Sequence, residues 1–164
     1  RGPATGALED PDLVSRVARS VALCRRRRAP LSLMLVEIDE FDDLVMQYGL
    51  AAAEAAHARI MALAGAVAQP APQTIAVGDG RFAALLEETE RSVAVTAARN
   101  LLLVADEALA RLSPPMTAAL SVGIACVALP AKNFPPADLV EAAQRCVFGV
   151  TAMGGGGVKS IDIW

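Results

Sequence analysis

Apolar residues recur along this chain with two different spacings, and these spacings predict alternating helices and strands. Leu13, Val17, Val21 and Cys24 repeat every three or four residues, which is the spacing of one helix face. The stretch 31–36 is instead continuously apolar apart from one serine, which is typical of a buried strand. Applied to the whole chain, the pattern predicts helices at 12–28, 40–48, 50–68, 90–112 and 136–152. It predicts strands at 31–39, 73–77, 81–86, 116–129 and 158–164.

The order of these elements predicts an α+β fold. They follow one another as α-β-α-α-β-β-α-β-α-β, and without the extra helices they leave a ferredoxin-like β-α-β-β-α-β core. The last helix and the C-terminal strand are additions to that core. We therefore expect a mostly antiparallel central sheet with helices packed on its faces. Residues 1–164 are expected to form a single domain.

Composition narrows the class of protein. Apolar residues make up 54% of the chain and the mean hydropathy is +0.42, but no apolar run approaches the roughly 20 residues that span a bilayer. We therefore expect no membrane contact within this segment, and the sequence has no signal-peptide pattern. Because the sequence starts at Arg1 without a methionine, we expect it to be a segment of a larger multidomain protein.

The cysteines and the histidine argue against several chemistries. Cys24, Cys126 and Cys146 lie far apart among apolar residues, so we expect them in the core of a protein from a reducing, cytoplasmic compartment. No Cys/His metal cluster can be built around His57, which is the single histidine. No serine lies in a GxSxG turn, so the sequence does not indicate a hydrolase triad.

Charge argues against one class of partner. The formal net charge is −3 and the isoelectric point is about 5.2, whereas nucleic-acid-binding domains are usually basic, so we expect no nucleic-acid partner. The run Arg25–Arg28 is a local exception. We interpret it as the solvated end of the first helix, with a functional anion-binding patch as the alternative.

Acidic residues follow the first predicted strand. Glu37 and Asp39 lie at its end, and carboxylates just beyond a buried strand are a common placement for a site. Glu40, Asp42 and Asp43 extend this cluster. They also suit the N-terminus of the following helix, so capping is the simpler interpretation of these three acids.

Two glycine-containing segments are candidate turns. In "GDGRF", residues 78–82, the pair Asp79-Gly80 is a strong signal for a two-residue hairpin turn. The run Gly154–Gly157 lacks the Lys-Ser/Thr pair of a phosphate-binding loop, so we interpret it as a flexible link to the last strand.

Four segments resemble the GGDEF, or diguanylate cyclase, domain family in their order and spacing. They are "PLSLMLVEIDEFDDLVMQYG", "AVGDGRFAALLEET", "LSVGIA" and "AAQRCVFGVTAMGGGGV", and Thr5-Gly6 extends the resemblance ahead of the first helix. In that family two GTP molecules, one on each domain of a dimer, are joined into cyclic di-GMP with the help of divalent metal ions. The resemblance therefore implies a module of a bacterial-type signalling protein.

The resemblance also implies where a metal site would lie. The metal-binding positions correspond to Glu37, the carbonyl group of Ile38, and Gly80, which offers no ligand. The next position, acidic in the family, is Arg81, whose charge opposes metal binding. Asp79 stands where the family has a glycine, which allows phosphates to approach the backbone closely. A negative side chain at this position would crowd and repel a triphosphate.

The remaining nucleotide-binding positions differ from the family as well. Val45 corresponds to the guanine-contacting residue, Glu54 to the acid that contacts guanine or ribose, and Thr151 and Gly155 to the phosphate-contacting cations. The inhibitory product site would lie at Gln69 and Pro72 and is expected to be absent. The expected vestigial pocket consists of Glu37, Ile38, Asp39, Val45, Glu54, Gly78, Asp79, Gly80, Arg81, Thr151 and Gly155.

These differences lead us to expect a catalytically inactive domain with a regulatory or protein-interaction role and no metal or cofactor. The expected partner is another protein or a second copy, and non-catalytic binding of GTP or cyclic di-GMP is the alternative. Two further interpretations stay open: Glu37, Asp39 and Asp79 together hold a cation and support weak cyclisation, or Arg81 binds an anion. The Ala-rich helix around His57 is expected to be either a dimer face or buried packing.

Overall fold

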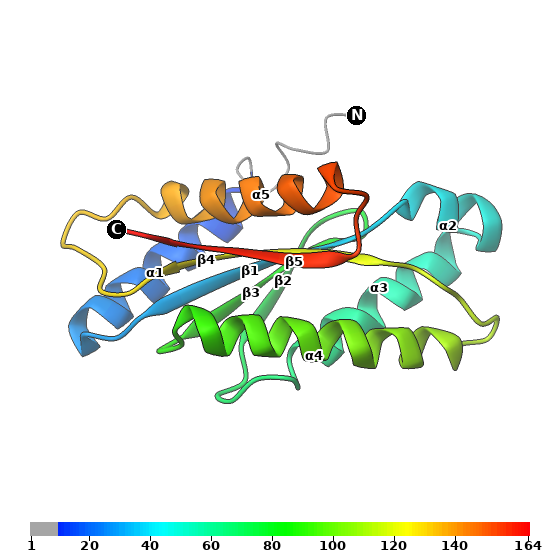
Figure 1. Ribbon diagram of the computed structural model, residues 1–164, viewed down its shortest axis with the longest axis horizontal. Helices are drawn as coiled ribbons and strands as arrows, with labels where there is room; N and C mark the ends of the chain where they lie inside the picture. The colour runs from blue at the N-terminus through cyan, green and yellow to red at the C-terminus, as the bar shows by residue number, and fades with distance from the viewer. Residues whose placement is uncertain (1–9) are drawn as a thin grey trace.

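The computed structural model describes residues 10–164 and contains a five-stranded sheet with helices on both faces (Figure 1). Thr5-Gly6 lies outside the described residues. The helices are α1 (Pro11–Arg27), α2 (Phe41–Tyr48), α3 (Leu50–Ala64), α4 (Arg91–Ala110) and α5 (Pro136–Ala152). The strands are β1 (Leu31–Ile38), β2 (Gln73–Gly78), β3 (Arg81–Glu87), β4 (Leu120–Val127) and β5 (Gly157–Ile163).

The sheet is mostly antiparallel, as predicted. Its strand order is β2-β3-β1-β4-β5, with β1 in the centre. β1 pairs antiparallel with both β3 and β4, and β2 pairs antiparallel with β3, whereas β5 runs parallel to β4. The α+β fold and the ferredoxin-like order of its core are therefore confirmed.

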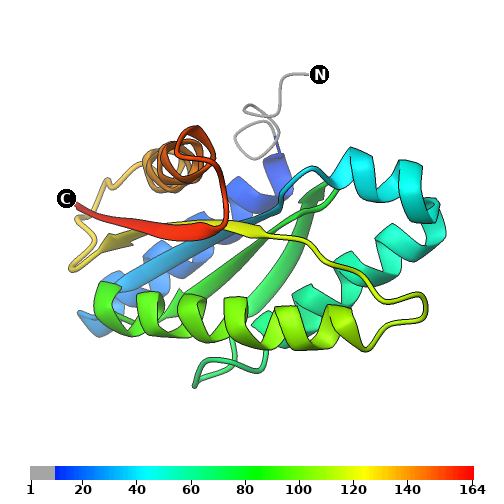
Figure 2. The same ribbon diagram turned by 45° about the vertical axis from the view of Figure 1, so that its right-hand side comes forward.

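Two helical layers enclose the sheet. α1 and α5 cover one face, and α3 and α4 cover the other, while α2 lies beyond the end of β1 (Figures 1 and 2). Alternation along β1 supplies both cores, because successive side chains of a strand point to opposite faces. Leu33 and Leu35 pack towards α1 and α5, and Met34 and Val36 pack towards α3 and α4.

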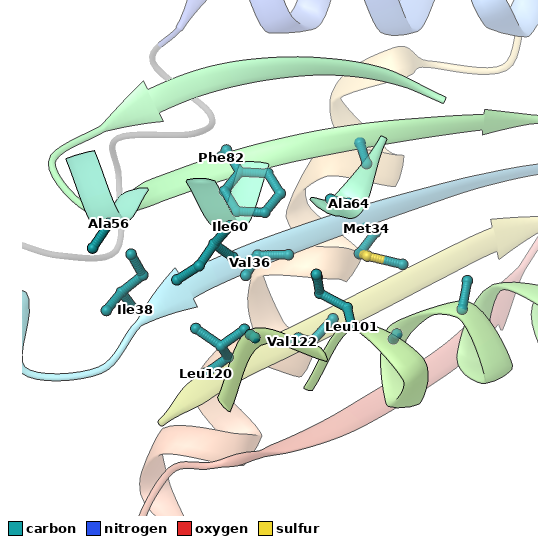
Figure 3. Close-up of a cluster of buried hydrophobic side chains, with 14 of the residues drawn as sticks. Met34, Val36, Ile38, Ala56, Ile60, Ala64, Phe82, Leu101, Leu120 and Val122 are labelled. Carbon is teal, nitrogen blue, oxygen red and sulfur yellow. The ribbon is translucent and has the colours of Figure 1, made fainter. Parts of the chain in front are cut away.

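Large side chains fill the core on the α3–α4 side. Ile60 of α3, Phe82 of β3 and Leu101 of α4 are fully buried there (Figure 3). Burying a side chain of this size contributes roughly 1.5–3 kcal/mol. This cluster also fixes how α3 lies against the strand that carries Phe82.

The ends of α1 show why the first helix lies where the sequence predicted. At its N-terminus the Asp10 carboxylate accepts hydrogen bonds from the backbone N–H groups of Asp12 (3.0 Å) and Leu13 (3.2 Å). At its C-terminus Arg28 adopts a left-handed conformation, and Arg27 forms a 2.6 Å ion pair with Glu88. The arginine run is therefore an exposed helix end, as predicted.

Several predicted boundaries were wrong by a few residues. α3 ends at Ala64 rather than residue 68, and β4 begins at Leu120 rather than residue 116. Glu90 occupies the cap position of α4, and the hydroxyl group of the preceding Thr89 donates to the carbonyl oxygen of Glu87 at 2.9 Å. For both α3 and β4, apolar residues continue from the helix or strand into the adjoining loop.

Other predictions concerned the cysteines, the Ala-rich helix and the membrane. Cys24 and Cys126 are buried and Cys146 is half-buried, and all three are free thiols. α3 buries one face, formed by Ala53, Ala56, Ile60 and Ala64, and exposes the opposite one. Within residues 10–164, no helix is both long and apolar enough to cross a bilayer.

Candidate functional site

The candidate site is a hollow of about 190 Å³ at the end of the central strand. The antiparallel pairing of β1 with β3 places the end of β1 beside the β2–β3 turn, with Glu37 directly opposite Arg81. The backbone N–H of Ile38 donates to the carbonyl oxygen of Gly80 at 2.8 Å. The residues that line the hollow are Glu37, Ile38, Glu40, Phe41, Asp42, Asp43, Asp79 and Arg81.

Gly80 is the centre of this turn and has no room for a side chain. It is buried, with φ at +67°, in the left-handed region that favours glycine. A Cβ atom at this position would lie 2.5 Å from Cγ and 2.8 Å from Cβ of Phe41. The phenyl ring at the start of α2 therefore occupies the space that an acidic side chain at position 80 would need.

Arg81 brings a cation to the wall of the hollow. Its guanidinium group packs over Gly78, with Nη2 at 3.1 Å and Nε at 3.4 Å from the point where a Cβ of Gly78 would lie. Across the strand pair it faces Glu37, and opposite charges at directly opposed positions stabilise a sheet by roughly 0.2–1 kcal/mol. The cation thus lies beside the carboxylate that would begin a metal site.

Asp39 does not line the hollow with Glu37 and Arg81 but binds the glycine run 154–157. Its carboxylate accepts a hydrogen bond from the Ser121 hydroxyl group at 2.7 Å and another from the Gly156 N–H at 2.9 Å. A Cβ atom on Gly155, which lies at φ +82°, would overlap the Asp39 carboxylate. The glycine run is therefore anchored to β1 and β4, and Asp39 has a structural role there.

The suggested cation site of three carboxylates is not formed. Asp39 binds the glycine loop, while Glu37 and Asp79 line the hollow. In the described part of the chain, no three His, Cys, Asp or Glu side chains are grouped so as to hold a metal ion. Magnesium prefers several oxygen ligands in near-octahedral geometry, and Glu37, Asp39 and Asp79 do not provide that arrangement.

Four of the predicted nucleotide-contacting positions lie outside the lining of the hollow. Val45 of α2 packs against the core, and Glu54 is exposed on α3. Thr151 lies exposed near the end of α5, where its hydroxyl group donates to the carbonyl oxygen of Phe148 at 3.1 Å. Gly155 belongs to the loop anchored by Asp39.

The positions of the expected inhibitory site lie elsewhere. Gln69 lines a separate groove of about 300 Å³ between the loop after α3 and the first half of α4. Pro72 is half-buried just before β2 and is not among the residues that line this groove. Neither side chain carries a charge with which to recognise a phosphate.

His57 adjoins the site. The sequence indicated only that it lies on the face of an Ala-rich helix and cannot form a Cys/His metal cluster. Its ring lies 5.9 Å from the ring of Phe82 and 6.2 Å from that of Phe41. Burial lowers the pKa of the imidazole below its ordinary value of 6.5, while a hydrogen bond with the backbone of Arg81 and the charges of Asp79 and Glu54 oppose this shift. The sequence signal for this position was that His57 is the single histidine and lies on an otherwise Ala-rich helix.

Comparisons with known proteins agree with the observed fold. The family model for the diguanylate cyclase GGDEF domain matches residues 12–154. Among solved structures, the FimX GGDEF domain from Pseudomonas aeruginosa is 22% identical and has a TM-score of 0.80, covering 98% of each chain. No curated protein sequence matches this chain.

Two further structures support the same fold. The active GGEEF domain of a diguanylate cyclase from Vibrio cholerae is 19% identical with a TM-score of 0.76, covering 91% of this chain and 94% of that one. The GGDEF domain of DgcB from Caulobacter crescentus, in complex with c-di-GMP, is 17% identical with a TM-score of 0.79, covering 98% and 96%.

Fold and site together define a cyclase-like α+β domain, in which a β-hairpin and the end of the central strand enclose the candidate pocket. The family model spans most of the chain, and the chain belongs to the GGDEF domain family of cyclic di-GMP signalling.

Proposed function

We propose that this GGDEF domain does not make cyclic di-GMP and acts as a regulatory or protein-interaction module in signalling. The observation that carries the proposal is the packing of Phe41 against Gly80. The position where the family places its second metal acid holds neither a ligand nor space for one. Phosphoryl transfer depends on positioning and charge neutralisation by metal ions, so the loss at this position removes the main source of both.

The charge of the hollow supports the same proposal. Five carboxylates and one guanidinium group line it. Negative charges repel one another, so the carboxylates would repel a triphosphate unless a metal ion offset the repulsion. The family's phosphate-contacting cations are replaced by Thr151 and Gly155, and each charge-assisted contact is worth roughly 1.5–3 kcal/mol.

A second candidate function is non-catalytic binding of a guanine nucleotide. Arg81 at the wall of the hollow is the observation that favours it, because a guanidinium group can bind phosphate in a bidentate manner. The DgcB domain, which is similar in fold, was crystallised with c-di-GMP. In this chain Arg81 would have to supply much of the attraction for such a ligand.

The proposed partner is another protein or a second copy of this domain, in the cytoplasm. Met46 and Leu50 expose 86% and 56% of their surface where α2 meets α3. In a fold relative from Pseudomonas aeruginosa, the diguanylate cyclase SiaD was crystallised with its activator SiaC. The exposed apolar corner formed by Met46 and Leu50 is the surface that we propose for a protein contact in this domain.

Calorimetric titration tests these alternatives. The domain is titrated with GTP and Mg²⁺ and, separately, with cyclic di-GMP, and the GTP mixture is then assayed for product. We expect no product and no binding tighter than about 10 μM, which is roughly −7 kcal/mol. Tighter binding without product would establish the nucleotide-binding alternative, and cyclic di-GMP production would overturn both proposals.

A further inference from the structure

His57 connects α3 to the turn that carries the family motif. Its ring packs against Phe82 with an interplanar angle of 30° and meets Phe41 edge-on at 71°. It also forms a hydrogen bond with the backbone of Arg81. We call these groups, the three rings and the Arg81 backbone, the aromatic clamp. Because Phe41 also packs against Gly80, the clamp holds α2, α3 and the hairpin 78–82 together.

The clamp is built for a neutral imidazole. The Nε2 atom of His57 is buried and has no hydrogen-bond partner within residues 10–164. In the imidazolium form both ring nitrogens carry protons, so Nε2 would become a buried donor without an acceptor. Such a group bears the full cost of its lost hydration.

Two carboxylates lie close enough to act on this ring. Asp79 is in the hairpin turn and Glu54 is one turn earlier on α3, and both favour the charged imidazole. From β3 the ring meets the backbone of Arg81, and from α2 it meets the uncharged ring of Phe41. Both carboxylates are exposed, so a protonated ring would be drawn outwards from between Phe41 and Phe82.

We propose that the aromatic clamp is pH-sensitive. The neutral ring of His57 holds the hairpin 78–82 and α2 against α3, and protonation of this ring releases them. The hollow is lined from both released elements, through Phe41 on α2 and Asp79 and Arg81 at the hairpin. Protonation would therefore change the shape of the candidate site. This inference goes beyond the proposed function, because it concerns the protein without any ligand.

The sign of the effect follows from the direction of the pKa shift. Because burial places the folded-state pKa of His57 below 6.5, the unfolded chain binds the proton more readily. The stabilisation is therefore complete above the unfolded pKa of 6.5 and is lost as the pH falls towards the folded pKa. Acidification should weaken the clamp, and neutral pH should restore it.

The test uses NMR titration of the intact domain, in which a single histidine gives one set of ring signals. We expect a titration midpoint below 6.5. Hydrogen-exchange protection of amides in 41–48 and 78–82 should fall at least about threefold between roughly pH 7.5 and pH 5.5, while that of β4 stays unchanged. A midpoint at or above 6.5, or protection that does not change in these segments, would overturn the proposal.

Two variants separate the clamp from general acid effects. His57→Phe keeps an aromatic ring but cannot titrate, so its protection in 41–48 and 78–82 should not vary over the same pH interval. Asp79→Asn removes an anion that favours the charged ring, so the His57 midpoint should move lower. If His57→Phe does not fold, the wild-type titration and Asp79→Asn still decide, because an unchanged or higher midpoint in Asp79→Asn contradicts the clamp.

Discussion

Gly80 and Phe41 occupy adjoining space at the candidate site, and each determines what the other can be. The turn requires a left-handed residue at position 80, and the phenyl ring lies where a Cβ would extend. A glycine at this position therefore does more than delete a metal ligand. It allows the start of α2 to close over the turn, and that closure makes any side chain costly.

Replacing Gly80 with alanine should destabilise the domain by about 2–5 kcal/mol. A left-handed conformation costs an alanine roughly 1–2 kcal/mol, and forcing a methyl group into a packed core typically adds 1–3 kcal/mol. Gly156→Ala is the matched control, because Gly156 lies at nearly the same φ, +68°, and the nearest atom to its Cβ position is the Cβ of Ala119 at 3.4 Å. Urea unfolding of both variants measures the difference, and equal losses would show that Phe41 does not limit the site.

Asp39 has a role at the residue scale that the sequence did not predict. Its two hydrogen bonds join the end of β1 to β4 and to the glycine run. We expect Asp39→Ala to cost about 1–3 kcal/mol, because the buried Ser121 hydroxyl group then lacks its acceptor. The amide of Gly156 should also exchange faster with solvent. Asp43→Ala, on the exposed side of α2, is the control and should leave that amide unchanged.

Part of the site could be predicted from residue identities alone. The spacing of the motifs located Glu37, Ile38, Asp79 and Arg81, and the structure brings these four to one hollow. The tie between Asp39 and the glycine run depends on residues 117 positions apart, so no local pattern indicates it. Likewise, the contact of His57 with Phe82 depends on how α3 packs on the sheet.

At the scale of elements, the apolar pattern determined which segments form helices and strands. Existence and order were predictable because the helices bury one face with a period near 3.6 residues, whereas the central strands β1 and β4 are buried on both faces and therefore continuously apolar. The ends were less predictable, since loops also contribute buried residues. Met116, for example, is 4% exposed but lies ahead of β4, in a loop that follows α4.

The N-terminal cap of α1 provides a prediction at this scale. Asp10→Ala should cost about 0.5–2 kcal/mol, because two backbone N–H groups of the first turn lose their acceptor. Asp12→Ala is the control, since Asp12 forms an exposed 3.6 Å ion pair with Arg16 that contributes at most about 0.5 kcal/mol. Thermal unfolding should rank the two losses in that order, and the reverse order would contradict the assigned cap.

At the scale of the whole molecule, the differences from the family are spread over separate parts of the fold. The metal positions lie on β1 and in the hairpin 78–82, whereas Val45 belongs to α2 and Thr151 to α5. The fold keeps these elements in the arrangement of a GGDEF domain, while the residues at these positions are not those of the family motif. If these positions bind nucleotide as they do in the family, restoring one of them leaves the others without the groups that recognise a guanine nucleotide.

The double variant Gly80→Asp/Arg81→Glu tests this conclusion. We expect it to make no detectable cyclic di-GMP from GTP and Mg²⁺, because Val45 cannot hydrogen-bond a base and Thr151 carries no positive charge. The overlap with Phe41 should also destabilise it, so circular dichroism must first show that it folds. Adding Phe41→Ala removes the overlap and provides a variant in which the restored acid has space. Product from either variant, measured by chromatography, would show that the hairpin 78–82 and the packing of Phe41 on it are all that separates this domain from an active cyclase. Its absence from a folded triple variant would support the role of the groups missing at Val45 and Thr151.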